Sequence, residues 1–175
     1  MENIEIKAQL ADPLAVLTKV QGLADSYLGL DHQIDTYFQT ERGRMKLRQS
    51  TLSGNYLILY QRPDQSGPRP SRYETISLER AEEVKTLLRN LLGEDIVVEK
   101  DRHIFLYKNI RIHIDHVTGL GDFLEFEAVM DSRYSDHALE TKKVQTLMEK
   151  LQISEESLIA LSYQDLLRDP GSKKP

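Results

Sequence analysis

Cationic and acidic side chains recur at every second position along several stretches of this chain. Residues 43–48 carry three cations on one parity, residues 123–127 carry two carboxylates, and residues 3–7 carry both signs. Residues two apart point to the same face of a β-strand. Arginine and lysine suit phosphate groups, and carboxylates beside phosphates suit Mg²⁺ or Mn²⁺. These stretches therefore indicate strands with one apolar face and one face equipped for phosphate and metal binding.

The elements that must carry this alternation are eight predicted strands, joined mostly by short turns. They cover residues 2–10, 33–39, 44–50, 55–62, 72–78, 96–107, 110–116 and 123–130. Short turns favour antiparallel pairing. Eight strands suit a small closed barrel whose interior is filled by side chains or holds one small ligand. We therefore expect an α+β fold built on a closed eight-stranded antiparallel β-barrel.

Helical spacing of apolar residues predicts four helices. They cover residues 13–28, 79–92, 136–151 and 155–167. Asp12 followed by Pro13 is a strong helix start, Gly93 is a typical stop, and Ser154 is a suitable cap for the last helix. Residues 64–71 (DQSGPRPS) are rich in turn formers, so we expect a mobile loop there.

Length and composition are typical of one globular domain, which we expect at residues 1–168 with a disordered tail at 169–175. The net charge of −5 argues against non-specific nucleic-acid binding. The absence of cysteine excludes disulfides and a cysteine nucleophile. There is neither an apolar run long enough to cross a membrane nor a signal-peptide pattern at the N-terminus. We therefore expect a cytoplasmic protein that binds neither nucleic acid nor membrane.

Two arrangements of the charged faces are compatible with the alternation. For a single antiparallel strand, a polar face in water is the ordinary case. Here all eight strands contribute, and both signs are present. The residues on the charged parity are Glu5, Lys7, Asp35, Arg44, Lys46, Arg48, Arg62, Arg72, Glu74, Lys100, Arg102, Arg111, Asp115, Glu125 and Glu127. Periodicity alone does not decide whether they line a lumen or cover the exterior. A lumen of this kind needs water, counter-ions or a polyanionic ligand, because an uncompensated buried charge costs several kcal/mol.

The order and spacing of these motifs resemble the CYTH superfamily, the triphosphate tunnel metalloenzymes, over nearly the whole chain. The motifs are residues 3–7 (NIEIK), 33–38 (QIDTYF), 43–48 (GRMKLR), Arg62, 72–74 (RYE), 98–102 (VEKDR), Asp115, 119–127 (GLGDFLEFE) and 162–167 (SYQDLL). The resemblance implies an eight-stranded antiparallel tunnel with the charged faces inside and the helices packed outside. It also implies Mg²⁺ or Mn²⁺ as cofactor and a triphosphate-containing small molecule as ligand, in a monomer or homodimer.

The resemblance assigns roles to two sets of residues. The metal-binding carboxylates would be Glu5, Glu125 and Glu127, with Asp115 and Glu74 as additional acidic contacts. The basic wall that grips the triphosphate would be Lys7, Arg44, Lys46, Arg48, Arg62, Arg72, Lys100 and Arg102. The resemblance names no catalytic base. For His113 we expect a satisfied or solvated histidine rather than a ligand contact, and for Tyr37 and Tyr60 a role in packing the barrel.

Asn3 departs from the family pattern, which has glutamate at this position of the opening Glu-x-Glu-x-Lys signature. The Asn-x-Glu-x-Lys form is similar to a subgroup labelled class IV adenylate-cyclase-like. Three functions follow as hypotheses: a metal-dependent triphosphatase, a cyclase that converts ATP to cAMP and pyrophosphate, and a non-catalytic polyphosphate or nucleotide binder. A fourth, weaker hypothesis is a barrel for an apolar ligand, which requires an apolar lumen.

Overall fold

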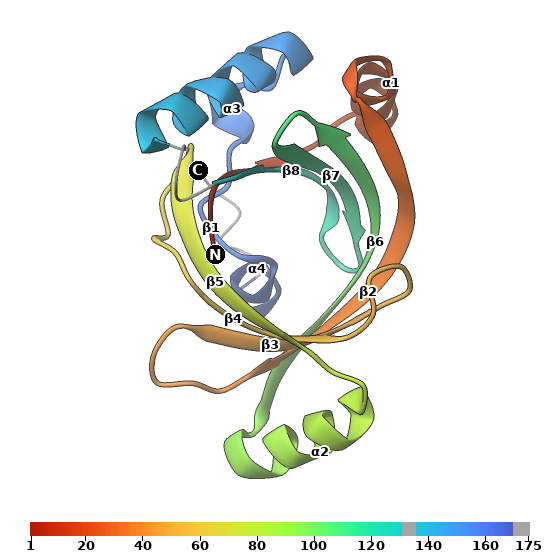
Figure 1. Ribbon diagram of the computed structural model, residues 1–175, viewed down its shortest axis with the longest axis vertical. Helices are drawn as coiled ribbons and strands as arrows, with labels where there is room; N and C mark the ends of the chain where they lie inside the picture. Colours follow the sequence, from red (N-terminus) through yellow and green to blue (C-terminus); the bar gives the residue numbers. More distant parts are fainter. Residues whose placement is uncertain (131–135, 170–175) are drawn as a thin grey trace.

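Eight strands form a closed barrel in the computed structural model, which describes residues 1–130 and 136–169 (Figure 1). The strands are β1 (Glu2–Gln9), β2 (Ser26–Phe38), β3 (Arg44–Ser50), β4 (Tyr56–Gln61), β5 (Arg69–Ser77), β6 (Glu94–Tyr107), β7 (Ile110–Val117) and β8 (Gly121–Val129). Their order around the barrel is β1-β5-β4-β3-β2-β6-β7-β8, and every neighbouring pair is antiparallel. The predicted closed eight-stranded antiparallel barrel is confirmed.

Helices cover part of the outside and one end of the barrel (Figure 1). They are α1 (Pro13–Leu23), α2 (Ala81–Leu92), α3 (His137–Leu151) and α4 (Tyr163–Arg168), with a 3₁₀ turn at Glu155–Ser157. The predicted start of α1 is correct: the Asp12 side chain accepts a hydrogen bond from the Ala15 amide, and Pro13 follows it. Gly93 ends α2 with φ of 81°, a conformation that favours glycine. No helix of the described residues combines the length and apolar character needed to cross a membrane.

The helix predicted at residues 13–28 is too long, because α1 ends at Leu23 and residues 26–28 belong to β2. Pairing with β6 decides this boundary. Tyr27 lies opposite Phe105 in the β2–β6 ladder, and the two rings lie 4.6 Å apart. A cross-strand aromatic pair of this kind outweighs a helical preference that is only local.

The helix predicted at residues 155–167 is also wrong. Leu158 forms a β-bridge with Ala8, and the Ile159 amide donates to the Lys7 carbonyl at 2.8 Å. These bonds require an extended backbone, so the helix begins afresh at α4 with Ser162, not Ser154, as its cap. The predicted disordered tail lies outside the described residues except for Asp169.

On β1, β3, β7 and β8 the apolar face points outward into clusters with helix residues, and the charged face points inward. Ile4, Ile6 and Phe126 are buried in a cluster with residues of α1 and α3, and Leu47 is buried beneath α2. Lys7, on the other parity of β1, is also buried but faces the lumen. The charged faces therefore meet inside the barrel, as the family resemblance implies. This excludes the apolar lumen that the fourth hypothesis requires.

Candidate functional site

A cavity of about 380 Å³ occupies the lumen. Its wall is made mainly by inward-facing residues of the strands, and Tyr163 of α4 and Ser162, which caps this helix, also contribute. The ionisable lining residues are Glu5, Lys7, Tyr37, Lys46, Arg48, Tyr56, Tyr60, Arg62, Tyr73, Lys100, Arg102, Arg111, Glu125, Glu127 and Tyr163. Cations outnumber carboxylates in this wall, although the whole chain carries a net charge of −5. The cavity is therefore suited to an anion.

Asp35 of β2 gathers three cations on one side of the lumen. It accepts hydrogen bonds from Lys46 at 2.8 Å, from Arg48 at 2.7 Å and from Lys100 at 2.8 Å. The Asp35 side chain is only 1% exposed. Burial opposes its ionisation, but attraction to the three cations holds the pKa of Asp35 well below its ordinary value. One carboxylate thus compensates three cations only in part, which leaves this side of the lumen positive.

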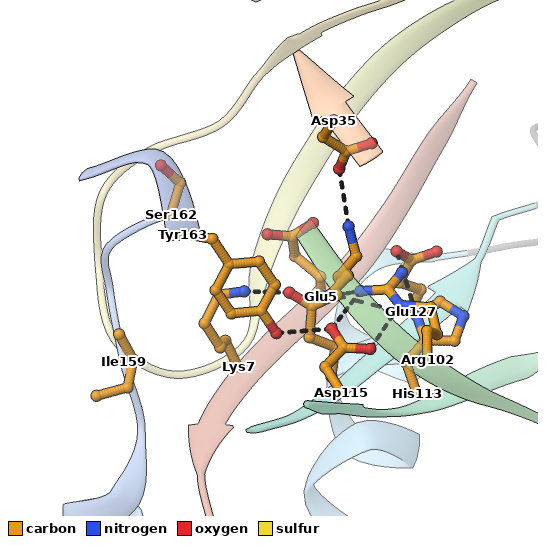
Figure 2. A network of polar contacts seen from close by, with 12 residues as sticks. Glu5, Lys7, Asp35, Arg102, His113, Asp115, Glu127, Ile159, Ser162 and Tyr163 are labelled. Carbon is orange, nitrogen blue, oxygen red and sulfur yellow. Dashed lines mark hydrogen bonds and ion pairs between the residues drawn. The ribbon is translucent and has the colours of Figure 1, made fainter. Parts of the chain in front are cut away.

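Glu125 of β8 and Asp115 of β7 hold a second network, part of which is drawn in Figure 2. Arg102 donates to both oxygens of Asp115, at 2.6 and 2.5 Å, and to Glu125 at 2.5 Å. Tyr163 of α4 donates to Asp115 at 2.7 Å, and Lys7 pairs with Glu125. Asp115 is fully buried, and both of its carboxylate oxygens accept hydrogen bonds from Arg102 or Tyr163. It therefore positions Arg102 rather than offering a free oxygen to the cavity.

Glu5 and Glu127 are direct cross-strand partners in the β1–β8 ladder, yet their carboxylates turn to different cations. Glu5 accepts from Arg62 at 2.8 Å and from Arg69 at 3.3 Å. Glu127 lies 3.0 Å from Arg111. Burial raises the pKa of Glu127, but the attraction of Arg111 and other nearby cations outweighs it and lowers the pKa overall. The lowered pKa keeps Glu127 ionised at neutral pH, so its carboxylate is available to a cation.

Two lysines of the lumen have pKa values near neutrality. Burial lowers the pKa of Lys100 to about 7, although Asp35 favours its charged form. Burial likewise lowers the pKa of Lys7 to about 8 despite its partner Glu125. A bound polyanion would favour the charged form of both lysines.

Most of the residues predicted for the site line the cavity. Those that do are Glu5, Lys7, Lys46, Arg48, Arg62, Lys100, Arg102, Glu125 and Glu127. Arg44 lies outside the cavity lining and pairs with Asp64 and Asp165. Asp115 lies behind Arg102, as described above.

The predicted inward orientation of Arg72 and Glu74 is wrong. Strand β5 begins at Arg69, where a mobile loop was expected, and Ser71, Tyr73 and Thr75 line the cavity. Arg72 is 76% exposed and pairs with Glu2 on the outside. Arg72, Glu74 and Ile76, on the outer parity of this strand, are all exposed. The outer face of β5 is therefore open to water, as is the outer face of β6 at Glu99 and Asp101.

Four residues in or next to the cavity wall have surroundings that the sequence did not predict. Asp35 and Arg111 were on the charged parity, but their partners lie on other strands. Arg69 was not predicted as a site residue, because the turn-forming residues around it indicated a loop. His113 was expected to be satisfied or solvated, but its side chain is buried and its Nδ1 atom has no hydrogen-bond partner among the described residues.

The lumen has donors that fit a divalent cation. One ligand atom each from His113, Glu125 and Glu127 lie within 4.8 Å of one another. The Asn3 Oδ1 atom is also buried in the cavity wall without a hydrogen-bond partner among the described residues. Carboxylate, amide and imidazole donors suit Mg²⁺ or Mn²⁺ to different degrees. Glu5 is not part of the three-residue cluster, because its carboxylate turns to arginines.

The fold and the cavity define a class of protein: a closed antiparallel β-barrel whose lumen carries a basic wall beside a carboxylate cluster. Comparison with known families identifies it further. The family model described as the CYTH domain matches residues 1–163. The chain therefore belongs to the CYTH domain family, the triphosphate tunnel family.

Individual relatives are distant. A Methanocaldococcus jannaschii protein named as a candidate adenylate cyclase is 27% identical, with 95% of this chain and 98% of the relative covered. The adenylate cyclase CyaB of Aeromonas hydrophila is 27% identical, with 94% and 87% covered. A Pyrococcus horikoshii structure has a TM-score of 0.84 at 22% identity and covers 94% of this chain and 98% of its own. A Hippeastrum adenylyl-cyclase candidate, described as having a dominant triphosphatase activity, has a TM-score of 0.64 at 15% identity, with 96% of each chain covered.

Proposed function

We propose that this protein is a metal-dependent triphosphatase that hydrolyses inorganic triphosphate or an organic triphosphate inside the lumen. The observation that carries the proposal is the cluster of Lys46, Arg48 and Lys100 around a single carboxylate, Asp35, in a cavity that also holds acidic side chains. Phosphoryl transfer depends mainly on positioning the phosphates and neutralising their charge. A partly compensated cation cluster beside carboxylates supplies both.

The basic residues differ in how they would act on a bound triphosphate. Lys46, Arg48 and Lys100 already share Asp35, so each can turn some of its donors to phosphate oxygens without leaving its partner. Arg102 is oriented by its two bonds to Asp115. Pre-oriented cations of this kind stabilise the charge that spreads over the transferred phosphoryl group and lose little entropy on binding.

Glu125 and Glu127 are the residues best suited to hold the metal, because their carboxylates are clustered and lowered in pKa. A divalent ion bound there would act as a Lewis acid toward phosphoryl oxygens. The protein residues around it would hold the triphosphate in one register along the lumen. Solvent water would then attack the terminal phosphorus in line, the bridging P–O bond on the opposite side would break, and phosphate and a diphosphate (pyrophosphate from inorganic triphosphate) would be released.

A second function has specific support in the names of the relatives. Both the Methanocaldococcus and the Aeromonas relatives are named for adenylate cyclase activity. In that reaction, the ribose 3′-hydroxyl of bound ATP attacks the α-phosphorus and releases pyrophosphate. The Hippeastrum structure, described by a dominant triphosphatase activity despite a cyclase-type name, supports placing hydrolysis first.

The experiment that tests the proposal is a substrate and metal panel with product identification. The full chain is incubated with tripolyphosphate or ATP, each with Mg²⁺ or Mn²⁺, and the products are separated by anion exchange. We expect phosphate release from at least one substrate. Formation of cAMP and pyrophosphate from ATP would support the cyclase instead, and binding without turnover under either metal would support a non-catalytic binder.

Matched variants connect any activity to the lumen. Glu127→Gln removes a charge from the carboxylate cluster, so we expect it to abolish metal-stimulated turnover. Glu74→Gln makes the same change on the outer face of β5, so turnover should be unchanged. A lumen site would be contradicted if both variants lost activity equally, or if both kept full activity.

A further inference from the structure

His113 lies on β7 on the same parity as Arg111 and Asp115, beside Glu125 and Glu127, and is not itself among the residues that line the cavity. Its side chain is only 6% exposed, and the Nδ1 atom has no hydrogen-bond partner among the described residues. The Nδ1 atom lies 3.8 Å from Glu127 Oε1 and 4.0 Å from Glu125 Oε2. A buried ring nitrogen without a partner is costly, so its position between two carboxylates calls for an explanation.

The distances are compatible with donors that could close on one ion. Two ligands that each lie about 2.1 Å from a metal are at most about 4.2 Å apart. Both separations from the His113 Nδ1 atom fall below that limit, and all three ligand atoms lie within 4.8 Å of one another. A small rotation of the side chains would bring the set into bonding distance.

The existing contacts of the two carboxylates leave room for this role. In Glu127, Oε2 faces Arg111, whereas Oε1 is the atom nearest to His113. In Glu125, Oε1 pairs with Lys7 and Oε2 accepts from Arg102. A carboxylate oxygen has more than one acceptor direction, so Glu125 Oε2 can keep Arg102 and still approach a cation.

We propose that His113 is a direct metal ligand, which makes the site one of mixed composition with one imidazole nitrogen and two carboxylates. The ligand set has a consequence for metal choice. Mg²⁺ and Mn²⁺ both suit carboxylate oxygens, but Mn²⁺, as a transition-metal ion, accepts an imidazole nitrogen more readily than the harder Mg²⁺. The site therefore prefers Mn²⁺ to Mg²⁺, and three protein ligands leave coordination positions for phosphate oxygens. This inference rests on the metal dependence of the proposed function.

The test uses Mn²⁺ alone as the probe and the metal-free full chain. Electron spin echo envelope modulation of bound Mn²⁺ detects a directly coordinated ¹⁴N nucleus. We expect imidazole ¹⁴N modulation in the wild type and its loss in His113→Ala. His116→Ala is the matched control, because His116 lies on the same strand, is 66% exposed and pairs with Asp122. Thermal unfolding of each variant shows whether it is folded.

Affinity provides a second readout. Loss of one ligand should weaken Mn²⁺ binding by about tenfold or more, with a smaller effect on Mg²⁺, so the preference for Mn²⁺ should narrow in His113→Ala. Bound Mn²⁺ without ¹⁴N modulation in an active wild-type enzyme would overturn the ligand assignment and leave the triphosphatase proposal standing. Absence of Mn²⁺ binding together with absence of metal-stimulated turnover would overturn both. The wild-type spectrum decides the matter even if His113→Ala does not fold.

Discussion

Replacing Asp35 with asparagine would leave Lys46, Arg48 and Lys100 in place but remove the charge that holds them together. The substitution preserves size and one acceptor oxygen, so the perturbation is mainly electrostatic. All three cations lie within 2.8 Å of an Asp35 oxygen, and the Asp35 side chain is 1% exposed. Little solvent is therefore available to compensate the change. We expect the ligand-free protein to lose stability and to regain it when a polyanion binds.

The magnitude follows from the burial of the cluster. Removing one partner of a buried ion pair costs about 3–5 kcal/mol, because the remaining charge is left uncompensated. The lower end applies here, since Lys100 has a pKa of about 7 and can shed its proton when Asp35 is neutral. For a chain of 175 residues, each kcal/mol lowers Tm by about 2–4 °C. The expected decrease in Tm is therefore about 6–12 °C.

The assay is thermal unfolding of the wild type and Asp35→Asn, with and without tripolyphosphate, at low ionic strength. Phosphate oxygens can take the place of the lost carboxylate, so the same tripolyphosphate concentration should raise the Tm of the variant more than that of the wild type. Asp31→Asn is the matched control. Asp31 is equally buried on β2, but its recorded donors are the neutral groups of Gln33, Ser50, Thr51 and Leu52. It should lose stability without any extra response to tripolyphosphate.

Two results would refute this reasoning. A Tm of Asp35→Asn within about 2 °C of the wild type would mean that the three cations do not depend on Asp35 for compensation. An equal response of Asp35→Asn and Asp31→Asn to tripolyphosphate would mean that the polyanion does not contact this cluster.

Three further predictions concern the same wall. Arg48→Ala should weaken tripolyphosphate binding by about tenfold or more in calorimetry, but it should lower Tm only slightly, because Asp35 keeps its two lysines. Arg72→Ala on the outer face is the control and should leave the affinity within about twofold of the wild type. Similar losses of affinity in both variants would contradict the lumen site. Because the pKa of Lys100 is about 7, its side chain is charged below pH 7 and neutral above it. The affinity of the wild type for tripolyphosphate should therefore fall about tenfold from pH 6 to pH 8, relative to that of Lys100→Arg. Parallel pH profiles of the wild type and Lys100→Arg would refute this prediction. Asn3→Glu should raise Mn²⁺ affinity, because it adds a negative charge where the amide oxygen has no hydrogen-bond partner among the described residues. Asn3→Gln is the neutral control, and unchanged affinity in Asn3→Glu would show that position 3 is remote from the metal.

The sequence predicted the barrel well where one parity of a strand is apolar and the other charged. The predicted bounds of the strand at residues 44–50 are those of β3, because Met45 and Leu47 alternate with cations there. Strand β5 has polar residues on both parities, so alternation could not orient it. Its orientation depends on pairing with β1, where Arg69 lies opposite Glu5. Residues 155–167 likewise have a helical pattern, but Leu158 is drawn into a bridge with Ala8.

Most residues of the site could be predicted from the sequence, but the contacts between them could not. Six of the eight predicted basic residues and the carboxylates Glu125 and Glu127 were found by parity and family resemblance, and they do line the cavity, whereas Arg44 and Arg72 do not. Asp115 was expected as an acidic contact, yet its oxygens are taken up by Arg102 and Tyr163. His113 had no signal beyond its parity. Partners that lie on different strands leave no local trace in the sequence.

The sequence by itself determined that this chain forms strands with one charged and one apolar face, because side-chain parity is a local property of each strand. Only the tertiary structure decided which face turns inward and which charges meet. Closing the barrel brings Lys46, Arg48 and Lys100 of two other strands onto Asp35, and it brings His113 beside Glu125 and Glu127. Burial then sets the energies: in water these charges would be independent, whereas inside the barrel each must be compensated by another residue or by a ligand.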